Sequence, residues 1–319
     1  MNQLSPPVIL QEVLEAKARG AESELASCIV KSQDHSVLDG TKTTCHLYHV
    51  KLDGNKRPMV IDLIRLAASS LVDYAIPRSR VAKAWEHYVK TNSAAEMSRL
   101  ADEARGLFTN SPLTGEGGEL LLFLLAEKVL RLPQLFSKMS LKTSTKHHFN
   151  GTDALHAGVS EAGTLALYWG EAKMHARWQS AVDEATEGLA IYLRNDNDKC
   201  RRDVQLLSEH IDLTDPALEE AICSYLLPSS PHYMQAEYRG IIFVGYNINS
   251  YSAAVDELTA EGLAEQVRNA YADWSQRVAS RIATEKVEAI VLHVFLLPFP
   301  CVQTFRTEFL KAVGGANAP

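Results

Sequence analysis

Residues 152–173 read TDALHAGVSEAGTLALYWGEAK, which is two apolar segments joined by a short polar turn. The run Leu165–Trp169 is continuously apolar, which is typical of a buried strand, and it leads directly into GEAK at 170–173. Asp153 lies beside the first segment, and Ser160–Gly163 predicts a hairpin turn between the two. The pattern therefore predicts two strands, one hairpin apart, that bring an Asp and a Glu-x-Lys motif together.

These residue types point to phosphodiester chemistry at a divalent metal. Asp153 and Glu171 would supply hard oxygen ligands for Mg²⁺, which keeps several of its waters. Such a metal activates a water and stabilises charge on phosphate oxygens. Lys173 follows Glu171 by two residues, so on a strand it shares the same face, where it can orient the water or neutralise charge. The alternative interpretation is a structural salt bridge.

A second Glu-x-Lys sequence shows why the surrounding pattern matters. Glu15-Ala16-Lys17 lies within residues 11–19, where the pattern predicts an exposed helix and no apolar run precedes the Glu. We interpret that copy as a solvated helix face, because the motif alone has a high chance frequency.

Composition places the chain among ordinary globular proteins. It has 319 residues, 46% of them hydrophobic and 22% charged, enough for one large domain or two smaller ones. Its five cysteines are scattered and form no C-x-x-C pair, which argues against a disulfide framework or zinc module and fits a reducing cytoplasm. We see no signal peptide, and the longest apolar stretches are too short to span a bilayer. These features predict a cytoplasmic protein without a membrane partner.

The net charge and the local charge pattern lead to opposite predictions about nucleic-acid binding. A net charge of −7 counts against a free-standing DNA binder. However, residues 131–150 contain no acid, and Lys138, Lys142 and Lys146 would share a face on a continuous strand. With His148 they form a candidate DNA-binding strip that follows phosphates. A solvated strand edge, where lysines block aggregation, explains them equally well.

The first part of the chain, residues 1–110, predicts a mixed α+β region. A helix is expected over 7–19, and the segments 43–52 and 59–67 are predicted to form a hairpin around Asp53-Gly54-Asn55. Residues 78–106 have a helical pattern. The turn-rich stretch 109–115 is the best candidate for a boundary with the core, 111–319.

The second part predicts an α/β core with a mixed sheet flanked by helices. An apolar helix is expected from Gly117 to Leu132, where Pro133 ends it. The remaining elements follow in a helix and strand order typical of α/β folds. Strands are predicted over 134–141, 152–159, 164–173, 240–246 and 287–297, and helices over 174–193, 216–225 and 252–283, the last as one long helix or a broken pair.

This order, with Asp153 on the second strand and Glu171-Ala172-Lys173 on the third, resembles the PD-(D/E)XK nuclease superfamily, whose members have a restriction-endonuclease-like fold. Thr152 stands where the motif name has proline. The resemblance implies Mg²⁺, with Mn²⁺ as a possible substitute, and the Ala172 carbonyl as a third ligand. It also implies a carboxylate from the core helix. Glu119 is at the matching place, and Glu116 is the competing choice.

A narrower resemblance involves three stretches: 117–123 (GGELLLF), 148–156 (HFNGTDALH) and 168–173 (YWGEAK). Together they resemble the HamA family, the nuclease subunits of the Hachiman antiphage defence system. That resemblance implies Mg²⁺-dependent DNA cleavage and a partner, a HamB-type superfamily-2 helicase. Residues 1–110 would then be a docking surface for the helicase, or a plain extension of the sheet.

Two other functions stay open from the sequence. A non-catalytic subunit that binds DNA or the helicase would use the fold as a scaffold, although the complete Asp, Glu and Lys set argues against it. A solitary restriction-type endonuclease would need a DNA-reading module, which the chain lacks. His147, His148, His156 and His175 crowd the same region, but their spacing fits no zinc pattern. Histidines satisfied within the structure, or helping to bind phosphate, are the favoured interpretation.

Overall fold

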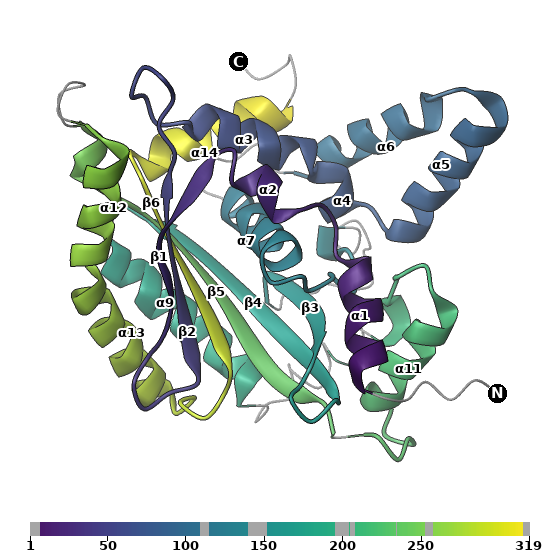
Figure 1. Ribbon diagram of the computed structural model, residues 1–319. Helices are drawn as coiled ribbons and strands as arrows, with labels where there is room; N and C mark the ends of the chain where they lie inside the picture. The colour runs from purple at the N-terminus through teal and green to yellow at the C-terminus, as the bar shows by residue number, and fades with distance from the viewer. Residues whose placement is uncertain are drawn as a thin grey trace.

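The computed structural model describes residues 7–108, 115–139, 152–194, 204, 208–233, 235–252 and 258–314. A six-stranded sheet crosses the molecule in the order β1-β2-β6-β5-β4-β3 (Figure 1). The strands are β1 (Ile29–Val37), β2 (Thr43–Val50), β3 (Ala154–Val159), β4 (Leu165–His175), β5 (Glu237–Asn247) and β6 (Leu292–Phe299). The four central strands pair in parallel, and β1 and β3 lie antiparallel at the edges. The predicted α/β fold with a mixed sheet is confirmed.

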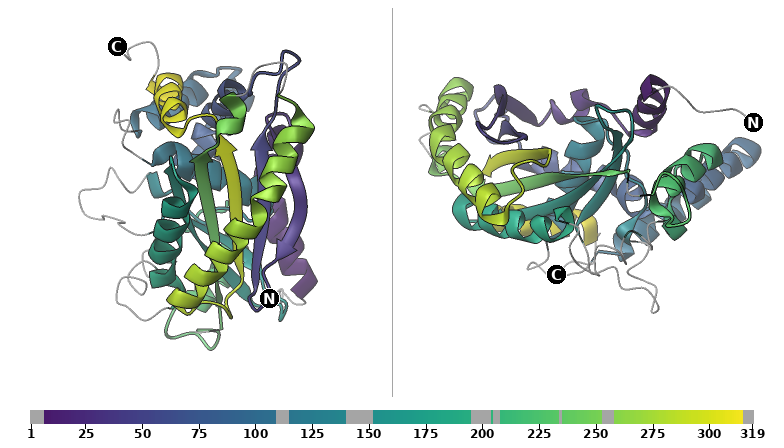
Figure 2. Two further views of the ribbon diagram at one scale, coloured as in Figure 1. Left: turned by 90° about the vertical axis from the view of Figure 1, so that its left-hand side faces the viewer. Right: turned by 90° about the horizontal axis from the view of Figure 1, so that it is seen from below.

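Helices flank both faces of this sheet (Figures 1 and 2). They are α1 (Pro7–Lys17), α2 (Glu22–Leu25), α3 (Val60–Ser69), α4 (Leu71–Ala75), α5 (Arg78–Thr91), α6 (Ala95–Gly106), α7 (Glu116–Lys128), α9 (Trp178–Leu193), α11 (Pro216–Leu226), α12 (Ala260–Asn269), α13 (Tyr271–Glu285) and α14 (Val302–Gly314), with a 3₁₀ turn η1 (Asn249–Ser252). The helical pattern over 252–283 is therefore a broken pair, α12 and α13.

Alternate residues of β4 separate the two cores. Ala166 and Tyr168 belong to the core that also contains residues of α7, α3 and α14, whereas Leu167 and Trp169 belong to the core that contains residues of α9 and α13. This period of two is expected for a central strand buried on both faces. It also fixes the direction of the residues that follow, since Glu171 continues the row of Leu167 and Trp169 toward α9.

The hairpin predicted around Asp53 is wrong in its second half. β2 is followed by a turn and a single bridge between Leu52 and Pro58, after which the chain enters α3 rather than a strand. The buried residues Leu63, Ile64 and Ala67 have helical spacing, which a short apolar run does not distinguish from a strand.

The antiparallel partner of β2 is instead β1, over residues for which the sequence pattern predicts no strand. β1 is an edge strand with mostly exposed or half-buried side chains, so its sequence needs no apolar alternation. On its other side, β2 pairs in parallel with β6, from Thr43 opposite Leu292 to Leu47 opposite Leu296. The N-terminal strands thus belong to the same sheet as β4.

The strand predicted over 134–141 is also absent from the part of it that is described. Gln134 forms an isolated bridge with His156, and residues 138–139 are helical. Pro133 and the short interval before the helical turn prevent a ladder from extending. The proposed shared face of Lys138, Lys142 and Lys146 therefore loses its basis, and Lys142, Lys146 and His148 lie outside the described residues.

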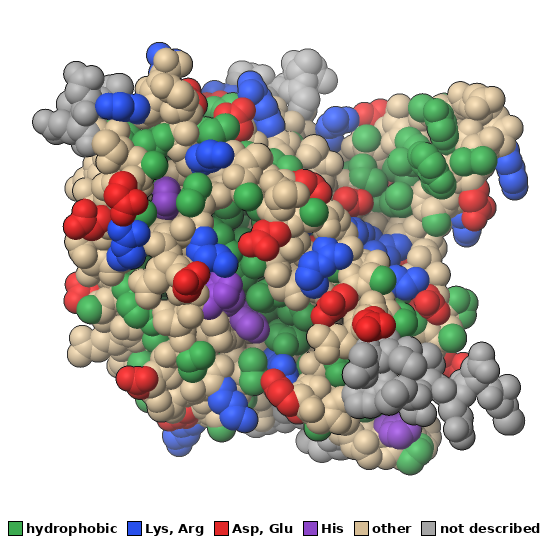
Figure 3. Space-filling view, viewed as in Figure 1, with side chains coloured by type: hydrophobic (Ala, Val, Ile, Leu, Met, Phe, Trp, Pro, Cys, Tyr) green, Lys and Arg blue, Asp and Glu red, His purple; other side chains and the backbone are tan. Residues whose placement is uncertain are grey.

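Helices α5 and α6 form a hairpin that projects from the body of the molecule (Figure 1). Hydrophobic side chains gather on this hairpin (Figure 3). On α5, Trp85 is 58% exposed and Val89 is 62% exposed, and Tyr88 is exposed with its ring stacked on Trp85. Across the described residues, no helix is both long and apolar enough to cross a membrane.

Candidate active site

The site forms where β3 stops and β4 continues. The β3–β4 ladder ends at the pair Ala154 and Gly170, and the Asp153 N–H still donates to the Gly170 carbonyl at 2.9 Å. Beyond this point the Asp153 side chain replaces the strand, because its Oδ2 accepts the Ala172 N–H at 3.0 Å. The sequence-predicted Asp and the start of the Glu-x-Lys motif are thus brought together.

The same geometry places the Ala172 carbonyl on the edge of β4 that faces Asp153. In a strand, the N–H and C=O of one residue face the same neighbour, as in the paired exchange of an antiparallel ladder. Since the Ala172 N–H points to Asp153, its carbonyl oxygen lies along the same uncovered edge of β4. A carboxylate and a carbonyl oxygen therefore share one edge.

Glu171 and Lys173 lie on the face of β4 covered by α9. Lys173 Nζ donates to Glu171 Oε1 at 2.5 Å. Burial raises the pKa of Glu171 to about 7, and the nearby Asp153 carboxylate adds to this rise. Burial works against the charged form of Lys173, but Glu171 and Asp153 together raise its pKa above the ordinary value. The Glu171 carboxylate is therefore costly to keep ionised without a cation.

Helix α9 approaches Glu171 through a glycine. A Cβ built at Gly188 would lie 3.2 Å from the Glu171 carboxyl carbon, a distance tighter than most real contacts. The absence of a side chain at this position leaves room for the carboxylate. The sequence contains no signal that would single out Gly188, because its role depends on how the helix packs.

Glu119 approaches from the first turn of α7. Its Oε2 accepts a hydrogen bond from the Tyr74 hydroxyl at 3.1 Å and lies 3.9 Å from Lys138 Nζ. Burial raises the pKa of Tyr74 well above its ordinary range, and Glu119 adds to the rise, so the hydroxyl remains a donor. Because Lys138 also contacts Asp153, this arrangement favours Glu119 over the buried Glu116 as the helix carboxylate of the site.

The donor atoms fit a hard cation. Within the described ranges, no three His, Cys, Asp or Glu side chains come close enough together to hold a metal ion. The candidate protein donors where β4 runs past β3 are the carboxylates of Asp153 and Glu171 and the carbonyl of Ala172, all oxygen. Such a set suits Mg²⁺, which binds through one or two carboxylates and keeps waters.

The described histidines of this region have structural partners. His156 is fully buried with Nδ1 2.9 Å from the Leu132 carbonyl oxygen, and burial lowers its pKa to about 4. His175 Nε2 lies 3.0 Å from a Glu184 carboxylate oxygen. His175 agrees with a histidine satisfied within the structure, whereas the buried Nε2 of His156 has no hydrogen-bond partner among the described residues. His147 and His148 lie outside the described residues.

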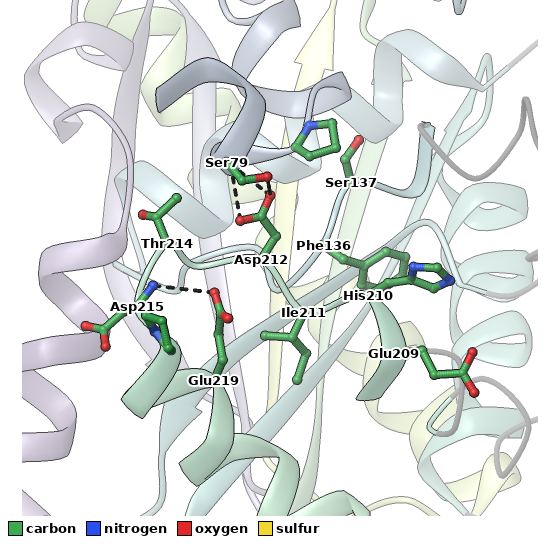
Figure 4. A pocket seen from close by; sticks show the side chains of 12 residues that line it. Ser79, Phe136, Ser137, Glu209, His210, Ile211, Asp212, Thr214, Asp215 and Glu219 are labelled. Atoms are coloured by element: carbon green, nitrogen blue, oxygen red, sulfur yellow. Dashed lines mark hydrogen bonds between the residues drawn. The ribbon is translucent and has the colours of Figure 1, made fainter. Parts of the chain in front are cut away.

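A cavity of about 600 Å³ opens between the base of α5 and α11 (Figure 4). Its acids hold loops in place: Asp212 Oδ2 accepts the Ser79 N–H at 2.9 Å and hydroxyl at 2.8 Å, and Glu219 accepts the Leu213 N–H at 2.7 Å. We assign no chemistry to this cavity. Ser137 lines it and leads directly into Lys138, so it neighbours the site along the chain.

A comparison with known families gives one match. The model of the HamA family matches residues 25–313, nearly the whole chain. The matched range includes the β3–β4 hairpin, α7 and the N-terminal strands. No curated protein matches the sequence.

Proposed function

Since the chain belongs to the HamA family, which supports a role as a subunit of Hachiman antiviral defence, we propose that it is a metal-dependent deoxyribonuclease of the PD-(D/E)XK type. The observation that carries this proposal is that Asp153 accepts the Ala172 N–H where β4 runs past β3, with the paired Glu171 and Lys173 on either side of Ala172 in the chain. A salt bridge with a purely structural role would not require the edge of β4 beside it to be left without a neighbouring strand.

Each residue of the site would have a distinct role. Asp153, Glu171 and the Ala172 carbonyl would hold Mg²⁺, or Mn²⁺ in its place, and Glu119 would join through a water. The bound ion supplies an activated water and stabilises charge on the phosphate. The Lys173 ammonium, on the same face as Glu171, orients the attacking water and offsets charge on the phosphate oxygens. Asp153, held by the Ala172 N–H, keeps its second oxygen directed into the site.

The test is plasmid nicking by the purified chain with Mg²⁺ or with EDTA. We expect Glu171→Ala and Lys173→Ala to reduce metal-dependent nicking to background. Glu308→Ala, which removes a half-buried partner of Lys311 on α14, is the matched control and should cut like the wild type. Full activity in Glu171→Ala would sink the assignment of the site.

We further propose that a superfamily-2 helicase is the partner and that the α5–α6 hairpin contacts it. Trp85, Tyr88 and Val89 follow the i, i+3, i+4 spacing by which a helix presents anchors to a groove. Lys83 and Lys90 flank them on the exposed surface. Aromatic anchors with a charged rim are typical of protein interfaces.

Co-purification tests this part separately. A Trp85→Ala, Val89→Ser protein should lose a co-expressed helicase, whereas Arg99→Ala on α6 should retain it. Retention by both proteins would place the contact elsewhere. A complex that forms normally but never cuts DNA would favour the second candidate, a non-catalytic scaffold subunit.

A further inference from the structure

The ammonium group of Lys138 stands among the acids of the site. Its Nζ lies 3.4 Å from Asp153 Oδ1 and 3.9 Å from Glu119 Oε2. The Lys138 side chain is 11% exposed, and those of Glu119 and Asp153 are nearly as enclosed. Lys138 also opposes the rise in the pKa of Glu171. One cation therefore acts on three carboxylates.

The backbone that carries Lys138 is anchored, while its side chain can move. The Ser137 hydroxyl donates to the Ala75 carbonyl at 2.5 Å, and the Gln134 N–H donates to Glu127 at 2.8 Å. Lysine has a flexible four-carbon stem that ends in a compact charge. Its ammonium can therefore leave the acids without any change in the fold.

The contacts of Lys138 are long for charge-assisted hydrogen bonds, which fall at about 2.7–2.9 Å. Another enclosed lysine, Lys128, provides the comparison: its Nζ lies 2.6 Å from Glu24 Oε2. Lys128 makes a tight bond to one carboxylate, whereas Lys138 stands loosely between two. Lys138 thus contributes positive charge to the site without a short hydrogen bond to either carboxylate.

The following inference rests on the proposed nuclease site. We propose that the Lys138 ammonium occupies the site when no metal is bound, and that it must withdraw from Asp153 and Glu119 before a divalent metal binds. An ammonium and a divalent ion repel strongly in an enclosed site, where the effective dielectric is low. Both need the same Asp153 oxygen. The metal and Lys138 therefore compete, and the chain without metal keeps its acids neutralised by its own side chain.

Mn²⁺ binding measured by isothermal titration calorimetry, without DNA, tests this competition independently of cleavage. Lys138→Met keeps the length of the stem and removes the charge. We expect it to bind Mn²⁺ at least about tenfold more tightly than the wild type, a difference of about 1.4 kcal/mol. Lys128→Met, which removes the other enclosed lysine, is the matched control and should bind Mn²⁺ as the wild type does.

The outcomes separate this inference from the function on which it rests. Equal or weaker Mn²⁺ binding by folded Lys138→Met overturns the competition. Lys138→Gln, which is neutral but polar, gives the same test if the Met protein does not fold. If the wild type and Glu171→Ala bind Mn²⁺ equally, or none of the proteins binds it, the metal site is wrong and the competition falls with it.

Discussion

Helix α7 brings one carboxylate into each of two buried polar clusters, and the two clusters are built differently. Near its C-terminal end, Glu127 accepts the Arg19 N–H at 2.6 Å, the Gln134 N–H at 2.8 Å and Arg78 Nη2 at 3.1 Å. At its N-terminal end, Glu119 accepts the Tyr74 hydroxyl at 3.1 Å and lies 3.9 Å from the ammonium nitrogen of Lys138.

Burial raises the pKa of Glu127, as it does that of Glu171, so burial alone does not separate structure from chemistry. The difference lies in the donors. Glu127 is held by backbone N–H groups and a guanidinium whose positions the fold determines. The carboxylates of the site face lysine ammonium groups, which can move aside and leave oxygen atoms for another cation.

The largest expected effect is on stability at Glu127. Glu127→Ala leaves Arg78 and two backbone N–H groups without their acceptor in the interior, and we expect a loss of about 3–5 kcal/mol. Glu119→Ala should cost much less, because the Tyr74 hydroxyl is a neutral donor and the Lys138 ammonium lies 3.9 Å from the carboxylate. Urea denaturation of both proteins measures the difference. Similar losses would remove the distinction between the two clusters.

Replacing the carboxylate by an amide should stabilise the metal-free protein at Glu171 and destabilise it at Glu127. The folded-state pKa of Glu171 is about 7 against an ordinary 4.5, so the folded chain binds the extra proton between these values. The stability of the metal-free protein therefore falls as pH rises through this window, and the full penalty remains above pH 7.

Glu171→Gln removes that penalty. Without metal, it should melt at a higher temperature than the wild type at pH 8, with a smaller gain at pH 5. Glu127→Gln should melt lower at pH 8, since its amide presents N–H groups to donors that now lack an acceptor. Thermal denaturation in EDTA at both pH values checks this, and a loss of stability in Glu171→Gln at pH 8 would contradict it.

A smaller effect is expected at Tyr74. Tyr74→Phe removes only the hydroxyl that donates to Glu119, and we expect a loss of about 1 kcal/mol with reduced nicking. Tyr246→Phe is the matched control, because that buried hydroxyl has no hydrogen-bond partner among the described residues. If both proteins lose equal stability in urea, the Tyr74 hydrogen bond adds nothing to Glu119.

The smallest change in stability is expected at Gly188. Gly188→Ala gains helix propensity of about 0.5–1 kcal/mol but crowds the Glu171 carboxylate, so stability should change little while nicking falls. Gly106→Ala, at a helical glycine with open space around it, gains propensity without a clash and should keep full activity. Unchanged nicking by Gly188→Ala would show that Glu171 tolerates displacement.

The core of the site was predictable because its signals are local. The apolar run of β4, the turn before it and the spacing from Asp153 to Lys173 all lie within one hairpin, and the structure brings these residues together. The roles of Tyr74 and Lys138 could not be predicted from the sequence, because both roles depend on contacts between elements far apart in the chain.

The errors in the fold have a similar cause. The apolar segment of α3 is too short for its period to distinguish a helix from a strand, and the polar sequence of β1 hides an edge strand. The shared face predicted for Lys138, Lys142 and Lys146 required a strand over 134–141. Gln134 forms an isolated bridge that does not continue into a strand among the described residues. In each case the deciding contact comes from a neighbour that the local pattern does not reveal.

The parallel pairing of β2 with β6 has a consequence for how the chain is made. β2 leaves the ribosome early, but its partner around Leu292 is among the last segments to be synthesised. The β3–β4 hairpin and α7 meet through shorter loops, which close at a lower entropic cost. A nascent chain that stops short of β6 would therefore carry the β3–β4 hairpin already paired, while the edges of β2 and β5 remain open to a chaperone.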